Sequence, residues 1–179
     1  MAFTNPENNL SELGLSDGMT VADLGAGIGE YSLLASKLVG SGKVYAFDIQ
    51  NTLLLKLKKE AEHKNLSNIE IIRVDLEKER GTPLKDNSVD ALIISNTLFL
   101  VEKKDVLIVE AKRILRQSGK ALVIDWADSF GGLGPQPENV FLEDKAHKLF
   151  KDNGFEIEKV LFDAGEHHYG FVARLKNNH

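Results

Sequence analysis

The residue types most able to do chemistry gather in residues 21–30, VADLGAGIGE. An apolar run there contains an acid, Asp23, and leads into three glycines at alternate positions, Gly25, Gly27 and Gly29. Because glycine has no Cβ, its backbone adopts conformations that other residues avoid and lets a ligand lie directly against the chain. A helix that starts after the glycines would add its N-terminal amides. The pattern predicts a small-molecule site, and a tight turn that needs glycine for geometry alone is the alternative.

The spacing of the glycines indicates which ligand fits. A dinucleotide fingerprint, G-x-G-x-x-G, needs a third glycine where this chain has Glu30. The pattern acid-x-G-x-G-x-G, from Asp23 through Ala26 to Gly29, instead resembles the first motif of class I S-adenosylmethionine-dependent methyltransferases. That cofactor carries an ammonium and a sulfonium and has no phosphate. A carboxylate at Asp23 suits such a cation and would repel a pyrophosphate.

Later polar positions match the places where this family binds the rest of S-adenosylmethionine. Asp48 ends an apolar strand about 19 residues after the glycine turn, where adenosine-binding folds of this type carry an acid that accepts the ribose hydroxyls. The resemblance implies that Ile49 packs on the adenine and that Asp75, followed by Leu76, accepts from the adenine amino group. Capping of the turn that follows is the alternative role of Asp75. The resemblance also implies that Asn96 reaches the amino-acid end of the cofactor.

A base for the methyl acceptor is expected in the turn of residues 163–169, because an antiparallel last strand would begin at the same edge of the sheet as Asp125 and Trp126. A histidine with a pKa near neutrality could deprotonate a phenol, an alcohol or an enol. We expect His168 to be this base, with Asp125 orienting or charging it; polar residues that are merely solvated at a turn are the alternative. No metal is expected, because neighbours such as His167 and His168 on one strand point to opposite faces and cannot both bind one ion without a bulge.

Hydrophobic periodicity predicts the elements that must position these residues. Apolar, β-branched runs predict strands, and apolar residues at helical spacing predict helices. Residues 1–18 are expected to form a short cap, with Pro6 starting a helix, and Asp105 is expected to cap the helix that it begins. The predicted strands are 20–24, 43–48, 69–74, 89–95, one ending at 125–126, 155–162 and 169–175; the predicted helices are 30–39, 51–65, 105–116 and 139–153.

Strands that alternate with helices and end in a hairpin predict an α/β fold, a doubly wound sheet whose last strand runs antiparallel. The resemblance, which covers residues 15–175, implies a Rossmann-like, seven-stranded sheet in the order 3-2-1-4-5-7-6. Ligands of such sheets bind outside the carboxyl ends of the parallel strands. The Gly- and Pro-rich connection of residues 127–138 is a candidate substrate loop.

Composition bounds the remaining possibilities. A chain of 179 residues with 42% apolar and 27% charged residues predicts one folded domain, residues 1–179. Zero cysteines exclude disulfides, thiolate metal sites and a cysteine nucleophile. The N-terminus lacks the features of a signal peptide and no apolar run has membrane-spanning length, so we expect a cytoplasmic protein. A net charge of −5 disfavours nucleic acid, as does Asn96-Thr97-Leu98-Phe99, which lacks the two prolines of the adenine-N6 methyltransferase tetrad.

We therefore expect an S-adenosylmethionine-dependent methyltransferase that acts on an oxygen, carbon or nitrogen of a small molecule, similar to small stand-alone relatives of the quinone-biosynthesis methyltransferases. Two alternatives stay open. The first is a cofactor-binding module, or a methyltransferase for protein or RNA, whose open acceptor face is covered by a protein partner or a second copy of the chain. The second is a nicotinamide oxidoreductase. Substrate specificity in this fold does not follow from the fold itself.

Overall fold

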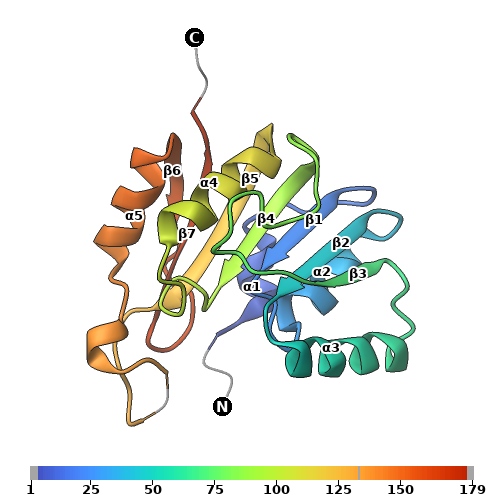
Figure 1. Cartoon of the computed structure of the whole chain (residues 1–179), viewed down its shortest axis with the longest axis horizontal. Helices are drawn as coiled ribbons and strands as arrows, with labels where there is room; N and C mark the ends of the chain where they lie inside the picture. The colour runs from blue at the N-terminus through green and yellow to red at the C-terminus, as the bar shows by residue number, and fades with distance from the viewer. Residues whose placement is uncertain (1–3, 133, 177–179) are drawn as a thin grey trace.

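A computed structural model describes residues 4–132 and 134–176, which form a seven-stranded sheet with helices on both faces (Figure 1). The strand order is β3-β2-β1-β4-β5-β7-β6, and β7 runs antiparallel to both of its neighbours. The expected Rossmann-like, doubly wound fold is thereby confirmed. No helix within these described residues is long and apolar enough to cross a membrane.

The strands are β1 (Thr20–Leu24), β2 (Lys43–Asp48), β3 (Ile69–Arg73), β4 (Val89–Ser95), β5 (Leu115–Trp126), β6 (Phe155–Val160) and β7 (His168–Leu175). The helices are α1 (Pro6–Ser11), α2 (Glu30–Val39), α3 (Asn51–His63), α4 (Lys104–Ile114) and α5 (Glu143–Asp152), with a 3₁₀ turn, η1 (Pro137–Asn139), before α5. The bounds of β1, α2, β2 and β4 are those predicted from the sequence.

Alternation along the central strands explains why helices cover both faces of the sheet. In β4, Leu92 and Ile94 pack in one apolar cluster with α4 and α5, whereas Ala91 and Ile93 pack in the other with α1 and α2. Side chains in the middle of such a strand are buried on either side. Polar side chains therefore reach a ligand only at the strand ends, where the predicted site residues lie.

The boundary between α4 and β5 differs from the prediction. The helix was expected to run from Asp105 to Arg116, but it ends at Ile114, and Leu115 already pairs with Val89 of β4. The N-cap residue is Lys103, so the expected cap by Asp105 was wrong. Gly119, expected to follow the helix, lies inside β5, where an added Cβ would come within 2.8 Å of a backbone carbonyl of β4.

The start of α5 was also predicted too early, at residue 139. Residues 140 and 142 are extended, and the Tyr169 hydroxyl donates a hydrogen bond of 2.9 Å to the Phe141 carbonyl, which holds this stretch against β7. The helix begins only at Glu143, where two acids in the first turn complement the helix dipole. Val140 and Leu142, the apolar residues that suggested an earlier start, lie in the extended segment before α5.

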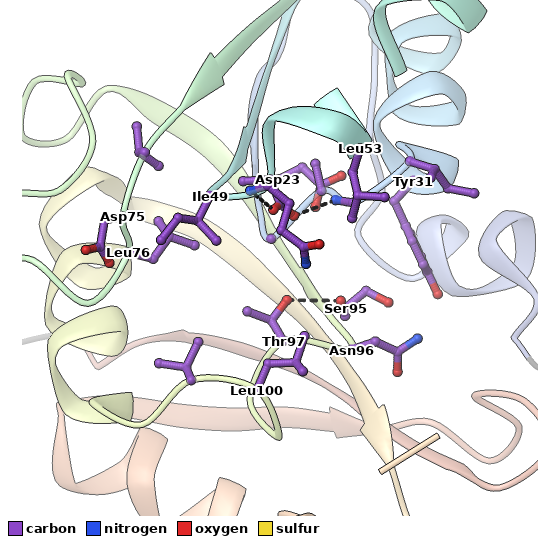
Figure 2. A pocket seen from close by; sticks show the side chains of 18 of the residues that line it. Asp23, Tyr31, Ile49, Leu53, Asp75, Leu76, Ser95, Asn96, Thr97 and Leu100 are labelled. Atoms are coloured by element: carbon purple, nitrogen blue, oxygen red, sulfur yellow. Dashed lines mark hydrogen bonds between the residues drawn. The ribbon is translucent and has the colours of Figure 1, made fainter. Parts of the chain in front are cut away.

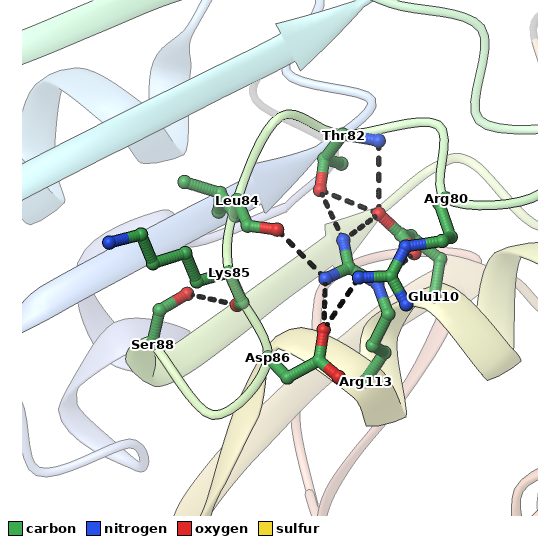
Figure 3. Close-up of polar contacts among 8 residues, drawn as sticks. All are labelled: Arg80, Thr82, Leu84, Lys85, Asp86, Ser88, Glu110 and Arg113. Atoms are coloured by element: carbon green, nitrogen blue, oxygen red, sulfur yellow. Dashed lines mark hydrogen bonds and ion pairs between the residues drawn. The ribbon is translucent and has the colours of Figure 1, made fainter.

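An ion-pair network fixes the connection between β3 and β4 onto α4 (Figure 3). The Arg113 guanidinium donates to both oxygens of Glu110, at 2.6 and 2.7 Å, to Asp86 at 2.7 Å and to the Leu84 carbonyl at 2.8 Å. Glu110 also accepts from the Thr82 amide and hydroxyl. Because the Glu110 side chain is only 2% exposed, its ion pair with Arg113 is a buried anchor for the segment after β3, which begins with the predicted site residues Asp75 and Leu76.

Candidate cofactor site

One cavity of about 580 Å³ lies at the carboxyl ends of β1, β2 and β4. Figure 2 shows Asp75, Leu76 and Ile49 toward one end of it and Tyr31 and Asn96 toward the other. Every residue predicted to bind the cofactor lines it except Gly29. The predicted residues in its wall are Asp23, Gly25, Ala26, Gly27, Asp48, Ile49, Asp75, Leu76 and Asn96.

The three glycines of the first motif have positive φ angles but serve different purposes. A Cβ on Gly25 would come within 2.2 Å of the Thr97 hydroxyl, and one on Gly29 within 2.1 Å of a Leu57 methyl group in α3. These two glycines are therefore required by packing within the protein. A Cβ on Gly27 would meet nothing within 4 Å, so only Gly27 leaves bare backbone facing open space. This cradle fits a ligand that lies against the chain.

Asp48 is held by the turn that it faces. One carboxylate oxygen accepts from the Gly27 amide at 2.9 Å and the other from the Gln50 amide at 2.8 Å. Each oxygen keeps a lone pair, since a carboxylate offers about four acceptor positions. The arrangement can therefore fix the glycine turn and still accept the two hydroxyls of a ribose.

Burial and a hydrogen bond govern the charge of Asp23. Its carboxylate accepts from the Ser32 hydroxyl at 2.6 Å and is 2% exposed. Burial raises the pKa of Asp23 to about 7, the Ser32 hydrogen bond opposes that rise, and the nearby Asp48 charge adds to it. A cation bound in the cavity would favour the ionised form of Asp23.

The segment after β3 forms the end of the cavity where the resemblance places the adenine. One Asp75 oxygen accepts from the Glu77 amide at 3.0 Å, so Asp75 caps the local turn while also lining the cavity. The capping role that the sequence left as an alternative is thus present in the structure. Three cavity residues with large apolar side chains, Ile28, Ile49 and Leu100, are 50%, 52% and 62% exposed, which suits a flat aromatic ligand.

The opposite end collects polar groups, several of which the sequence did not single out. Asn96 has a φ of +52°, an uncommon conformation for a residue other than glycine, and its buried Oδ1 has no hydrogen-bond partner among the described residues. Tyr31 and Ser95 line the same region (Figure 2). The Tyr31 hydroxyl accepts from Asn9 of α1 at 2.9 Å. An unpartnered acceptor beside these hydroxyls fits the ammonium of an amino acid.

The charged side chains that line the cavity are all acidic. Its lining contains no lysine, arginine or histidine among the described residues. The acidic residues in its wall are Asp23, Glu30, Asp48, Asp75, Glu77 and Glu102. Such a wall attracts a cation and repels the pyrophosphate of a dinucleotide. S-adenosylmethionine fits this combination of features: the bare backbone at Gly27, the acidic wall, the exposed apolar side chains and the unpartnered Oδ1 of Asn96.

The two predicted catalytic residues lie outside the cavity lining, and the structure does not join them. Asp125 is fully buried and accepts from the Leu98 and Trp126 amides, both at 2.8 Å. His168 instead bonds the Glu166 carbonyl through Nδ1 at 2.7 Å. Among the described residues, Asp125 thus makes no hydrogen bond through which it would orient His168. Burial raises the pKa of Asp125 to about 6, while its backbone donors oppose that rise.

Comparison with known proteins agrees with this geometry. A methyltransferase-domain family matches residues 15–167. The ubiquinone/menaquinone biosynthesis C-methyltransferase UbiE of Hahella chejuensis is 32% identical over 172 residues, which cover 95% of this chain. The chain spans only 64% of the length of that relative.

Solved structures extend the likeness. A SAM-dependent methyltransferase from Aquifex aeolicus superposes with a TM-score of 0.87 and 31% identity, covering 97% of this chain and 91% of its own. A putative type 11 methyltransferase from Sulfolobus solfataricus superposes with a TM-score of 0.78 and 26% identity, covering 99% of this chain and 95% of its own. The chain therefore belongs to the methyltransferase-domain family, and with it to the class I S-adenosylmethionine-dependent methyltransferases.

Proposed function

We propose that this protein transfers a methyl group from S-adenosylmethionine to a small-molecule acceptor. The observation that supports the proposal most strongly is the acidic cavity built on the bare backbone of Gly27. When bound, the cofactor supplies an electrophilic methyl group on a positively charged sulfur. In this proposal Asp48 holds the ribose, Asp75 and Leu76 the adenine, and Asn96 the amino-acid end.

A carbon atom of a hydroxylated ring is the first acceptor to test, because the curated relatives are C-methyltransferases of ubiquinone and menaquinone biosynthesis. Methyl transfer from a sulfonium depends mainly on holding the two reactants in line. The protein's contribution is then to orient the acceptor in front of the cavity and, for a weakly acidic acceptor, to remove a proton.

The test is a methyl-transfer assay on the purified chain, with S-adenosylhomocysteine quantified by mass spectrometry. The acceptors are 1,4-naphthohydroquinone kept reduced under anaerobic conditions, 4-nitrocatechol, an aliphatic amine and an aliphatic alcohol. We expect S-adenosylhomocysteine to accumulate only when an acceptor is present. No product with any acceptor, despite saturable binding of S-adenosylmethionine, would reject catalysis by the chain alone.

A cofactor-binding module that works with a protein partner is the second candidate. The observation that favours it is Phe162, a fully exposed aromatic side chain in the loop between β6 and β7, beside Val160, which is 53% exposed. Exposed apolar surface of this kind is often covered by a partner. The same assay, run with and without protein that co-purifies from the source cell, separates the candidates.

A further inference from the structure

A second group of functional side chains lies at the carboxyl end of β5, outside the cofactor cavity. His167 precedes β7, and Asp128 lies in the loop that follows β5. The Nδ1 atom of His167 is 2.8 Å from one Asp128 carboxylate oxygen and 3.1 Å from the other. The His167 ring stacks on Phe130 with centroids 4.1 Å apart. Two loops far apart in the sequence thus form one aspartate–histidine pair on an aromatic support.

The backbone shows that His167 is held in a demanding position. Its φ is +62°, in the left-handed region that residues other than glycine seldom occupy. The His167 carbonyl accepts a hydrogen bond of 2.8 Å from the Ala127 amide, which ties the turn to the end of β5. Such strained conformations concentrate at functional sites. Here the strain presents an imidazole at the same edge of the sheet as the cofactor cavity.

The free nitrogen of His167 is accessible. With Nδ1 on Asp128, Nε2 makes no hydrogen bond, and it is not among the buried unpartnered atoms of the described residues. A carboxylate that accepts from Nδ1–H leaves Nε2 as the basic nitrogen and stabilises the imidazolium that forms when Nε2 takes a proton. The pair therefore has the arrangement of an oriented general base.

His168 lacks both a carboxylate partner and an accessible ring nitrogen. Its ring packs on Trp126 with centroids 4.3 Å apart, and its Nε2 is buried without a partner. Burial lowers the pKa of His168, which opposes the charging that a base undergoes, although the Glu166 carbonyl opposes that shift. His168, the base expected from the sequence, is therefore a weaker candidate than its neighbour His167.

We propose that His167 is the catalytic base that deprotonates the methyl acceptor and that Asp128 is its positioning residue. This assignment rests on the proposed methyl transfer. The lone pair of His167 Nε2 takes the proton of the acceptor hydroxyl. The electron-rich acceptor atom forms a bond to the methyl carbon, the methyl–sulfur bond breaks, and its electron pair stays on sulfur, which becomes a neutral thioether. Where the acceptor atom is a ring carbon, that carbon then loses its own hydrogen as a proton and the ring oxygen takes one up, which restores the aromatic ring. The imidazolium releases its proton to water, so charge and atoms balance.

The test exploits the acidity of the acceptor. A weakly acidic hydroxyl, as in 1,4-naphthohydroquinone, needs the base, whereas 4-nitrocatechol is largely ionised at pH 8 and does not. General bases typically contribute a factor of 10²–10⁴. We expect His167→Gln to lower kcat for the naphthohydroquinone about 100-fold, and Asp128→Asn about tenfold. With 4-nitrocatechol at pH 8, both variants should stay within about threefold of wild type.

Controls separate catalysis from structure. The dissociation constant of S-adenosylmethionine should change less than about twofold in His167→Gln, and the exposed His63→Gln of α3 should behave as wild type in every assay. The acid limb of the kcat/KM profile should disappear in His167→Gln. Asp128, Glu166 and His168 are titratable neighbours of His167, so the profile of His168→Gln is measured as well.

The outcomes are distinct. If wild type methylates the naphthohydroquinone and His167→Gln does so equally well, or if His168→Gln alone removes the acid limb, the assignment of His167 is overturned while the proposed function stands. An equal loss on both acceptors shows a structural role and also overturns it. If wild type methylates no acceptor, the proposed function fails and the assignment fails with it.

Discussion

Replacing Gly27 with alanine is expected to block the cofactor while leaving the fold nearly intact. The φ of Gly27 is +56°, inside the left-handed region that an alanine can adopt, and the new methyl group would meet no protein atom within 4 Å. The cost to folding is then the backbone term alone, about 1 kcal/mol. For a chain of this size that lowers Tm by about 2–4 °C. The methyl group would instead occupy the cavity floor, where we expect the ligand to lie.

Gly29→Ala is the matched control from the same motif. Its φ of +88° lies at the edge of the left-handed region, farther from the values that an alanine adopts, and the new Cβ would come within 2.1 Å of Leu57. Overpacking of about 1–3 kcal/mol then adds to strain of about 1–2 kcal/mol. The expected fall in Tm is several times that of Gly27→Ala. Because Gly29 does not line the cavity, the folded fraction of this variant should bind the cofactor almost normally.

Calorimetric titration with S-adenosylmethionine and thermal unfolding measure the two effects separately. Gly27→Ala should weaken binding at least tenfold, about 1.4 kcal/mol, with a small change in Tm. Gly29→Ala should weaken binding less than about threefold, with a large change in Tm. Wild-type affinity in Gly27→Ala, or an equal loss of stability in both variants, would refute the assignment of separate roles to these glycines.

Two further predictions concern buried carboxylates. Arg113→Met should destabilise the protein by about 3–5 kcal/mol in urea titration, because Glu110 is left charged and unpaired, whereas Arg116→Met removes a more exposed pair and should cost under about 1 kcal/mol. Burial raises the pKa of Glu110, but hydrogen bonds from Arg113 and Thr82 outweigh burial and lower that pKa in the folded state. The stabilisation by Glu110 is therefore complete above its pKa in the unfolded chain and is lost as pH falls through its pKa in the folded protein. Equal losses of stability in Arg113→Met and Arg116→Met would contradict this role of the buried ion pair. For Asp23, whose pKa burial raises to about 7, a cationic ligand should favour ionisation, so S-adenosylmethionine should bind more weakly as pH falls below 7 and release a proton on binding. Asp23→Asn should lack that proton release in calorimetry across buffers of different ionisation enthalpy, and identical release from both proteins would disprove the linkage.

The bounds of helices and strands were predicted correctly where a local sequence pattern determines them. Thr20–Leu24 is a short run with β-branched residues, and Glu30–Val39 carries apolar residues at helical spacing. Both flank the glycine motif and were predicted to the residue. The α4–β5 boundary failed because Ser118 and Gly119 are usual signals for the end of a helix. Pairing of Leu115 with Val89 across the sheet overrode them. The residues around Leu115 do not by themselves indicate this pairing, because its partner strand lies far away in the sequence.

In the candidate site, too, the residues marked by a local sequence pattern could be predicted, whereas those that depend on tertiary packing could not. Asp48 and Asn96 could be named because Asp48 ends one predicted strand and Asn96 follows another, at positions that resemble the family's motif. The interpretation of Gly29 as a ligand-binding glycine missed its contact with Leu57, which depends on how α3 packs. His167 was passed over for His168 because only the folded chain brings Asp128 beside it. Spacing indicated the turn, but not which of two adjacent imidazoles meets the carboxylate.

An acidic cavity with a bare backbone floor should select a cationic adenosyl ligand over a dinucleotide. Calorimetric titration of one protein preparation with S-adenosylmethionine and with NADH tests it directly. Saturable binding of S-adenosylmethionine well below about 1 mM, with no heat from NADH at the same concentrations, is the predicted result. Saturable binding of NADH without binding of S-adenosylmethionine would contradict it.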